Sequence, residues 1–224
     1  MTKLPLRLVI FDCDGVLVDS EGPSCRLVAQ EVAALGWPIS PAQGRALFTG
    51  RRLSDIPAIV EPHLGRTVPP GWIAALRDKL IAMLAEEVEA MPGAHAALAA
   101  TQALGLSYRV ASNSSHEEMA VKFGRTGLAP LVAGRTHSAR DVAQGKPAPD
   151  VFLAAAAADG VAPGACLVVE DSVPGALAAR AAGMACVGLA PHGDDPALRA
   201  AGAVLIATLD ALPALLRVAM ATAA

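Results

Sequence analysis

Aromatic residues make up only 3% of this 224-residue sequence, although hydrophobic residues make up 54%. Ala, Leu and Val supply most of the apolar content, which suits helices packed on a sheet and argues against disorder. The formal net charge is −3, and no cluster of Lys and Arg alternates with aromatic residues. Because a basic surface is the usual mark of nucleic-acid binding, this composition disfavours that function.

Long apolar runs are also missing. No stretch approaches the ~18 uninterrupted apolar residues of a membrane span. The apolar run near the N-terminus stops at Asp12, which is too short for a signal peptide. We therefore expect a soluble cytoplasmic protein with no membrane or nucleic-acid partner, either a monomer or a weak homo-oligomer.

Cysteine is scarce, and its spacing indicates neither a metal site nor a disulfide framework. The four cysteines are Cys13, Cys25, Cys166 and Cys186. Cys166 and Cys186 lie in apolar, strand-like runs, so we expect them to pack as small hydrophobic side chains.

The sequence does contain a short apolar run, Leu8–Phe11, followed at once by Asp12 and Asp14. The run predicts a fully buried strand. In open α/β sheets, ligands bind beyond the carboxyl ends of the strands, so paired acids at that point are placed for chemistry. The same residues would also fit a strand that ends in an ordinary Asp-Gly turn.

Residues 20–88 show helical patterns and no strand pattern. The expected helices cover residues 22–35, 41–48, a segment starting near Ser54, and 72–88. Ser40, Pro41 and Gln43 predict an N-terminal capping box for the second of these helices.

After Pro92-Gly93 the pattern changes to helices alternating with strands. We expect helices at 94–104, 116–124, 150–159, 174–182 and 196–201, and a final helix that closes the chain. We expect strands at 108–111, 131–133, 166–169, 185–189 and 203–206. Such alternation predicts an α/β fold with a doubly wound parallel sheet. The core would comprise residues 1–18 and 89–224, and an all-helical domain, residues 19–88, would be inserted into it.

Polar side chains follow several of the predicted strands. Ser112 and Asn113 follow one strand, and Glu170 and Asp171 follow another. Lys146, one of only four lysines, lies between Gly and Pro in a loop of the same half of the chain. We expect these groups to meet Asp12 and Asp14 at one edge of the sheet.

This set of groups suits phosphoryl transfer. Carboxylate oxygens are the ligands that Mg²⁺ prefers, and hydroxyl groups and a lysine suit phosphoryl oxygens. One aspartate could attack phosphorus to form an aspartyl-phosphate, while a second protonates the leaving oxygen and then deprotonates water.

The motifs resemble those of the haloacid dehalogenase superfamily. They are, in the family's order, Asp12–Ser20, Ser112, Gly145-Lys146-Pro147 and Glu170-Asp171-Ser172. The resemblance implies a Rossmann-like core over most of residues 4–18 and 90–220. It also implies that the helical insertion is a small cap of the phosphatase and β-phosphoglucomutase branch.

The resemblance further implies roles for these residues. Asp12 would be the nucleophile and Asp14 the general acid/base. Ser112 would bind the phosphate, and Lys146 would steady both phosphate and nucleophile. Apart from the resemblance, we expect Asn113 to help shape the phosphate pocket. Mg²⁺ would be held by Asp12, Asp171 and the backbone carbonyl of Asp14, with Glu170 supporting the metal directly or through water.

Two features separate branches of the family. The name-giving dehalogenases lack a counterpart of Asp14 and the metal site, so that chemistry is disfavoured. The β-phosphoglucomutases carry a cap histidine where this sequence has Ser24. We therefore expect a phosphatase for a sugar or sugar-acid phosphate, with a sugar phosphomutase and a non-catalytic phosphometabolite-binding module as alternatives. Arg51 and Arg52 could bind a second anionic group of the substrate, or they could simply be a solvated pair.

Overall fold

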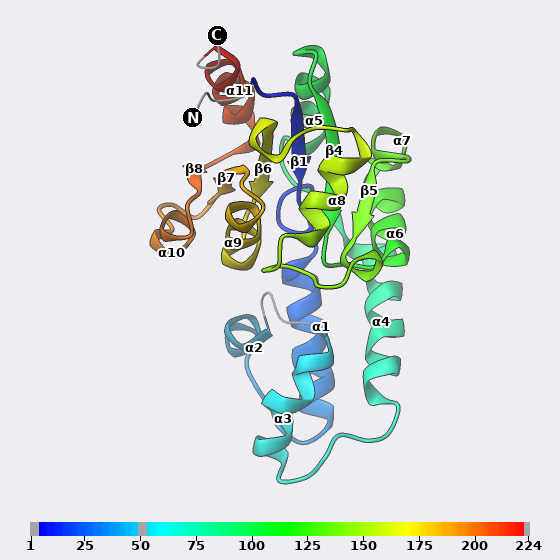
Figure 1. Cartoon of the computed structure of the whole chain (residues 1–224). Coiled ribbons are helices and arrows are strands. Elements are labelled where there is room, and N and C mark those ends of the chain that lie inside the picture. Colours follow the sequence, from blue (N-terminus) through cyan, green and yellow to red (C-terminus); the bar gives the residue numbers. More distant parts are fainter. Residues whose placement is uncertain (1–4, 49–52, 222–224) are drawn as a thin grey trace. The chain divides into compact units, whose positions relative to one another are not determined.

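The computed structural model, which describes residues 5–48 and 53–221, separates into two units. The larger unit consists of Met1–Val18 and Ala90–Ala224, and the smaller consists of Asp19–Glu89. The larger unit contains the parallel sheet, and the smaller is helical (Figure 1).

The sheet of the larger unit has six strands in the order β5-β4-β1-β6-β7-β8, and every pair is parallel. The strands are β1 (Leu8–Phe11), β4 (Ser107–Ser112), β5 (Thr136–Ser138), β6 (Cys166–Glu170), β7 (Ala185–Leu189) and β8 (Val204–Ile206). From β1 the chain runs outward through β4 to β5, and then crosses to β6 on the other side of β1. The direction of winding therefore reverses beside β1, which is where ligands bind in sheets of this kind.

Helices cover both faces of this sheet, as the sequence predicts. They are α5 (Ala94–Ala103), α6 (His116–Thr126), α7 (Ala129–Val132), α8 (Asp150–Ala158), α9 (Val173–Ala181), α10 (Pro196–Ala200) and α11 (Leu212–Ala221). On one face α8 packs against β1, β4 and β5 and α9 against β6 and β7, while α5 and α11 pack together on the other (Figure 1). Because both faces are covered, the four residues of β1 are completely buried, which explains their unbroken apolar run.

The smaller unit is built from four α-helices in the part that the structure describes. These are α1 (Glu21–Ala34), α2 (Pro41–Phe48), α3 (Ile56–Leu64) and α4 (Trp72–Glu87). The capping box predicted for α2 is confirmed: the Ser40 backbone N–H donates to Gln43 Oε1 at 2.9 Å, and the Gln43 N–H donates to Ser40 Oγ at 3.2 Å. Trp72 and Leu76 belong to the unit's buried cluster, and Trp37 stacks on His63.

Two two-residue strands, β2 (Val18–Asp19) and β3 (Glu89–Ala90), pair where the chain leaves and re-enters the larger unit. Across residues 5–48 and 53–221, no helix is both long and apolar enough to cross a membrane.

The strand predicted at 131–133 is wrong. Those residues fall mostly in the short helix α7, which carries a proline in its first turn, and the strand that follows α6 is β5, Thr136–Ser138. A run of three apolar residues does not distinguish a strand from one buried helical turn. Because β5 lies at the edge of the sheet and is only partly buried, its residues are polar and carry no apolar pattern.

The packing of the smaller unit predicts the effect of Leu76→Ala. Leu76 is 1% exposed, so its truncation should leave a cavity and lower the free energy of unfolding by about 2–5 kcal/mol. Both tryptophans of the sequence, Trp37 and Trp72, lie in this unit. Their fluorescence during urea unfolding should therefore report the loss as a lower midpoint.

Leu153→Ala serves as the matched control, because Leu153 is 38% exposed and lies in the larger unit. We expect it to change the free energy of unfolding by about 0.5 kcal/mol or less. Equal shifts for the two variants would contradict the assignment of Leu76 to a packed core.

Candidate active site

The carboxyl ends of β1 and β6 bring two acids together. The two strands run side by side with Phe11 opposite Val169, and the Asp12 N–H donates to the Val169 carbonyl at 2.9 Å. Asp12 therefore continues beside Glu170, the last residue of β6. Both are buried, at 6% and 1% exposure.

Lys146 links these two carboxylates. Its Nζ lies 2.5 Å from Asp12 Oδ1, 2.8 Å from Glu170 Oε1 and 2.9 Å from the carbonyl oxygen of Ala111. An ammonium group has three N–H donors, so these contacts use its full capacity. Phe152 of α8 lies beneath it, with the ring centroid 4.7 Å from Nζ. The side chain of Lys146 is thus held on all sides inside the larger unit.

For both Asp12 and Lys146, burial and the opposite charge of the neighbouring group shift the pKa in opposite directions. Burial raises the pKa of Asp12 to about 7, although the attraction of Lys146 works against this rise. Burial would by itself lower the pKa of Lys146, but the charges of Asp12 and Glu170 outweigh it and raise that pKa above its usual value. Lys146 therefore stays charged at neutral pH. Asp12, in contrast, changes between its protonated and ionised forms near pH 7.

Glu170 is fixed at both carboxylate oxygens. Its Oε1 accepts from Lys146, while its Oε2 accepts from the backbone N–H groups of Asp171 and Ser172, both at 2.9 Å, and from Ser172 Oγ at 2.8 Å. Since Ser172 is also the N-cap of α9, Glu170 ties the site to the start of that helix.

Two glycines make room for the acids. A Cβ at Gly175, in the first turn of α9, would overlap the carboxylate of Glu170. A Cβ at Gly15 would overlap the carboxylate of Asp171, and Gly15 also has a φ of +75°, which favours glycine. The close approach of backbone to carboxylate explains both residues.

Asp14 lies in a separate hydrogen-bonded group. Its Oδ2 accepts from Ser114 Oγ at 2.8 Å and from Ser112 Oγ at 3.3 Å, and its Oδ1 is 2.6 Å from Lys122 Nζ. The position of Ser112 beside Asp14 agrees with the expected meeting of strand ends. The sequence motifs did not predict a functional role for Ser114 or Lys122.

A sequence pattern could have revealed Lys122. It lies between Met119 and Phe123 on the buried face of α6, where a charged residue is unusual. The pattern of one lysine inside an apolar helix face indicates a buried partner of opposite charge, but it does not identify that partner.

Asn113 fastens the loop that carries Lys146. Its Oδ1 accepts from the Lys146 backbone N–H at 2.9 Å, and its Nδ2 donates to the Lys146 carbonyl at 3.4 Å. His116, in contrast, is exposed and paired with Asp141. Arg51 and Arg52 lie outside the described residues.

Asp12, Glu170 and Asp171 could together hold a metal ion, because one carboxylate oxygen from each lies within 4.8 Å of the others. Hard oxygen donors of this kind fit Mg²⁺. Carboxylates grouped at one sheet edge can in general act as nucleophiles or transfer protons.

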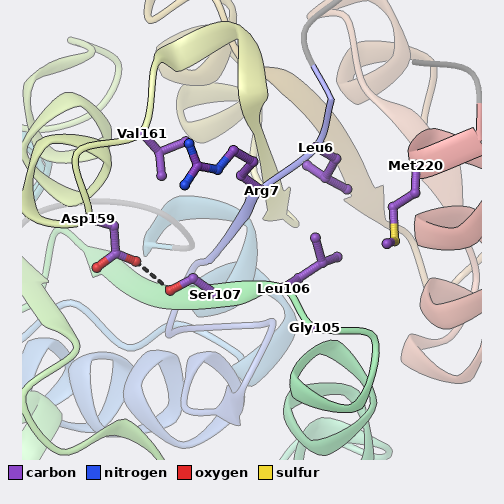
Figure 2. Close-up of a pocket in the computed structure, with 8 residues that line it drawn as sticks. All are labelled: Leu6, Arg7, Gly105, Leu106, Ser107, Asp159, Val161 and Met220. Atoms are coloured by element: carbon purple, nitrogen blue, oxygen red, sulfur yellow. Dashed lines mark hydrogen bonds between the residues drawn. The ribbon is translucent and has the colours of Figure 1, made fainter. Parts of the chain in front are cut away.

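A cavity of about 330 Å³ lies at the opposite, amino-terminal edge of the sheet (Figure 2). Figure 2 shows Arg7, Ser107 and Asp159 on its wall, with Ser107 hydrogen-bonded to Asp159. Asp159 is also paired with Arg109 at 2.5 Å. Although burial opposes ionisation, the hydrogen bonds from Arg109 and Ser107 lower the pKa of Asp159. The charge of Asp159 is thus balanced by that of Arg109, at the edge of the sheet opposite to Asp12.

Comparison with known proteins agrees with this geometry. A family model described as haloacid dehalogenase-like hydrolase matches residues 6–183. The putative phosphatase YhcW of Bacillus subtilis (strain 168) is 32% identical, with 81% of this chain and 82% of that protein covered. The 6-phosphogluconate phosphatase of Escherichia coli (strain K12) is 31% identical, with 80% of each covered. The structure of a HAD family hydrolase from Deinococcus radiodurans R1, with bound phosphate and sodium, is 32% identical, has a TM-score of 0.81 and covers 96% of each chain.

The close approach of α9 to Glu170 predicts the effect of Gly175→Ala. The added methyl group should displace the carboxylate and, through it, Lys146, and overpacking of this kind costs about 1–3 kcal/mol. The free energy of unfolding from urea titration of the variant measures this cost.

Gly124→Ala is the matched control. Gly124 also lies in a helix of the larger unit, but a Cβ there would have no neighbour within 4 Å. The control should stabilise the protein by up to about 1 kcal/mol, because alanine is the better helix former. An unchanged free energy of unfolding in Gly175→Ala would show that the position of Glu170 does not depend on the absence of a side chain at Gly175.

Proposed function

The chain belongs to the haloacid dehalogenase-like hydrolases, and we propose that it is a Mg²⁺-dependent phosphatase for a small phosphorylated sugar or sugar acid. The observation that carries the proposal is the burial of Lys146 between Asp12 and Glu170 at the sheet edge where Asp14 also lies. The names of the relatives support it, since two are named as phosphatases and the D. radiodurans structure holds phosphate.

The proposed reaction has two displacements at phosphorus. A carboxylate oxygen of Asp12 forms a bond to phosphorus, the bond to the leaving oxygen breaks, and Asp14 gives that oxygen its proton. Asp14 then takes a proton from water, whose oxygen attacks the aspartyl-phosphate. The bond between phosphorus and Asp12 breaks, and phosphate leaves with both aspartates restored.

The other residues bind and orient. Lys146 holds Asp12 at Oδ1 and supplies positive charge beside the phosphoryl oxygens, and Ser112 is assigned to phosphate binding. Asn113 supports this part of the site by holding the backbone of Lys146.

We assign the Mg²⁺ site to Asp12, Asp171 and the backbone carbonyl of Asp14. When bound, the ion would stabilise the negative charge that the phosphoryl oxygens carry in the transition state. Glu170 is assigned an indirect role, through water or through the loop that it holds, because both of its oxygens already accept hydrogen bonds.

Substrate choice is assigned to the helical unit, residues 19–88, as a cap. A cap that closes over such a site excludes bulk water and contacts the part of the substrate beyond the phosphate. Arg51 and Arg52 are the candidates for binding a second anionic group, such as the carboxylate of a sugar acid.

The proposal predicts the outcome of a phosphate-release screen with Mg²⁺ over sugar phosphates and sugar-acid phosphates, including 6-phosphogluconate. The wild-type protein should release phosphate from at least one of them. Asp12→Asn should lower the rate about 10³-fold or more, because the nucleophile is lost. Asp141→Asn, which changes an exposed acid paired with His116, should keep the wild-type rate.

Three other outcomes would overturn the assignment. Undiminished turnover by Asp12→Asn would exclude Asp12 as the nucleophile. Isomerisation of a hexose 1-phosphate without net phosphate release would show a phosphomutase instead. Binding of a phosphometabolite without turnover of any would show a non-catalytic module.

The raised pKa of Asp12 predicts that Mg²⁺ binding depends on pH. Asp12 has a pKa of about 7 in the metal-free protein, so below that pH it must lose a proton before it binds a cation. The Kd for Mg²⁺ should therefore rise about tenfold between pH 8 and pH 6. Isothermal titration calorimetry at the two pH values, in buffers of different ionisation enthalpy, measures both the Kd and the proton released. A Kd independent of pH over this range would contradict the prediction.

A further inference from the structure

The buried face of α6 contains a lysine. Lys122 is only 4% exposed, and its neighbours on that face, Met119 and Phe123, are 1% and 2% exposed. A buried ammonium group is strongly unfavourable unless a partner of opposite charge and hydrogen-bond acceptors surround it. The position of Lys122 in the fold therefore depends on what it contacts.

Its partners form a closed triangle with Asp14. Lys122 Nζ is 2.6 Å from Asp14 Oδ1 and 2.8 Å from Ser114 Oγ, and Ser114 Oγ in turn donates to Asp14 Oδ2 at 2.8 Å. Each member contacts the other two, and both oxygens of the carboxylate are held. Asp14, Ser114 and Lys122 all belong to the larger unit.

The triangle is separate from the group around Asp12. Lys146 places its three donors on Asp12, Glu170 and a carbonyl, whereas the ammonium group of Lys122 lies 2.6 Å from Asp14 Oδ1. The side chain of Asp14 is 26% exposed, against 9% for that of Asp12, and it lies in the turn beside Gly15. Without a fixed partner, a partly exposed carboxylate in a turn has rotational freedom, which proton transfer does not tolerate well.

We propose that Lys122 is a positioning residue which, together with Ser114, holds the carboxylate of Asp14 in the orientation required for proton transfer. This inference rests on the function proposed above, in which Asp14 is the general acid and base. Lys122 does not contact the substrate; it acts only through Asp14. The two aspartates are thus each held by a buried lysine of their own, Asp12 by Lys146 and Asp14 by Lys122.

A double-mutant cycle on kcat tests the proposal. Lys122→Met keeps the length and apolar character of the side chain and removes its charge and donors. It should lower kcat about 10- to 100-fold and change KM less than about threefold, since substrate contacts are retained. In an Asp14→Asn background the same change should have little further effect, because Lys122 acts only through Asp14.

Two further variants complete the kinetic test. Ser114→Ala, which removes the third member of the triangle, should also lower kcat with little change in KM. Arg199→Met, which changes an exposed cation of the larger unit paired with Asp194, should leave kcat and KM unchanged. Equal losses for Lys122→Met in the wild-type and Asp14→Asn backgrounds would show a merely structural role and overturn the proposal, as would wild-type kcat in Lys122→Met.

A measurement without turnover separates this inference from the proposed function. The sequence has four lysines, Lys3, Lys79, Lys122 and Lys146. The ¹⁵Nζ resonance of Lys122, assigned by comparison with Lys122→Met, should be observable with slow hydrogen exchange in the wild type. It should shift or exchange faster in Asp14→Asn, while that of Lys146 stays in place.

The two failures can be told apart. If the wild type releases phosphate but the ¹⁵Nζ resonance of Lys122 is unchanged in Asp14→Asn, the positioning role is wrong and the phosphatase activity is still supported. If no phosphoester is turned over while the resonance responds as expected, the proposed function is wrong. The positioning role proposed for Lys122 in the reaction is then wrong with it, although its contact with Asp14 is confirmed.

Discussion

The ammonium group of Lys146 is the feature on which the site depends. Carboxylates crowded at the edge of one sheet repel one another, and burial raises the pKa of Asp12. Lys146 offsets this by contacting Asp12, Glu170 and the carbonyl of Ala111 at once. Removing one partner of such a buried group leaves an uncompensated charge and costs about 3–5 kcal/mol. The arrangement therefore couples the stability of the core to the geometry of the site.

The topology of the sheet makes this contact possible. Because β1 lies between β4 and β6, the ends of three strands converge, and Asp12, Ser112 and Glu170 come from segments far apart in the sequence. Backbone packing then leaves space for the acids, at Gly15 for Asp171 and at Gly175 for Glu170. The loop with Lys146 is fastened to the same edge by Asn113, which accepts from the Lys146 backbone N–H.

The two aspartates of the first motif occupy different surroundings. Asp12 is buried beside Lys146, and its pKa is raised to about 7, whereas Asp14 is partly exposed and held by Lys122 and hydroxyl groups. Unequal environments of this kind allow paired acids to take different roles, and the proposed function assigns attack on phosphorus to Asp12 and proton transfer to Asp14. The family match and the relatives named as phosphatases support the proposed phosphatase activity, and the roles of the two acids belong to that proposal.

The amino-acid sequence by itself determined the class of fold. An unbroken apolar run indicates a strand buried on both faces, and apolar residues at helical spacing indicate a helix buried on one face. It also singled out Asp12, Lys146 and Glu170 through motifs in a workable order, and the structure brings these three residues into contact. It misplaced β5, whose edge position removes the apolar pattern, and it did not single out Lys122. Only the tertiary structure decided that Lys122 contacts Asp14, 108 residues away, and that both oxygens of Glu170 are engaged. Such pairings depend on strand register and on the rotation of α6 about its axis, and local sequence patterns encode neither.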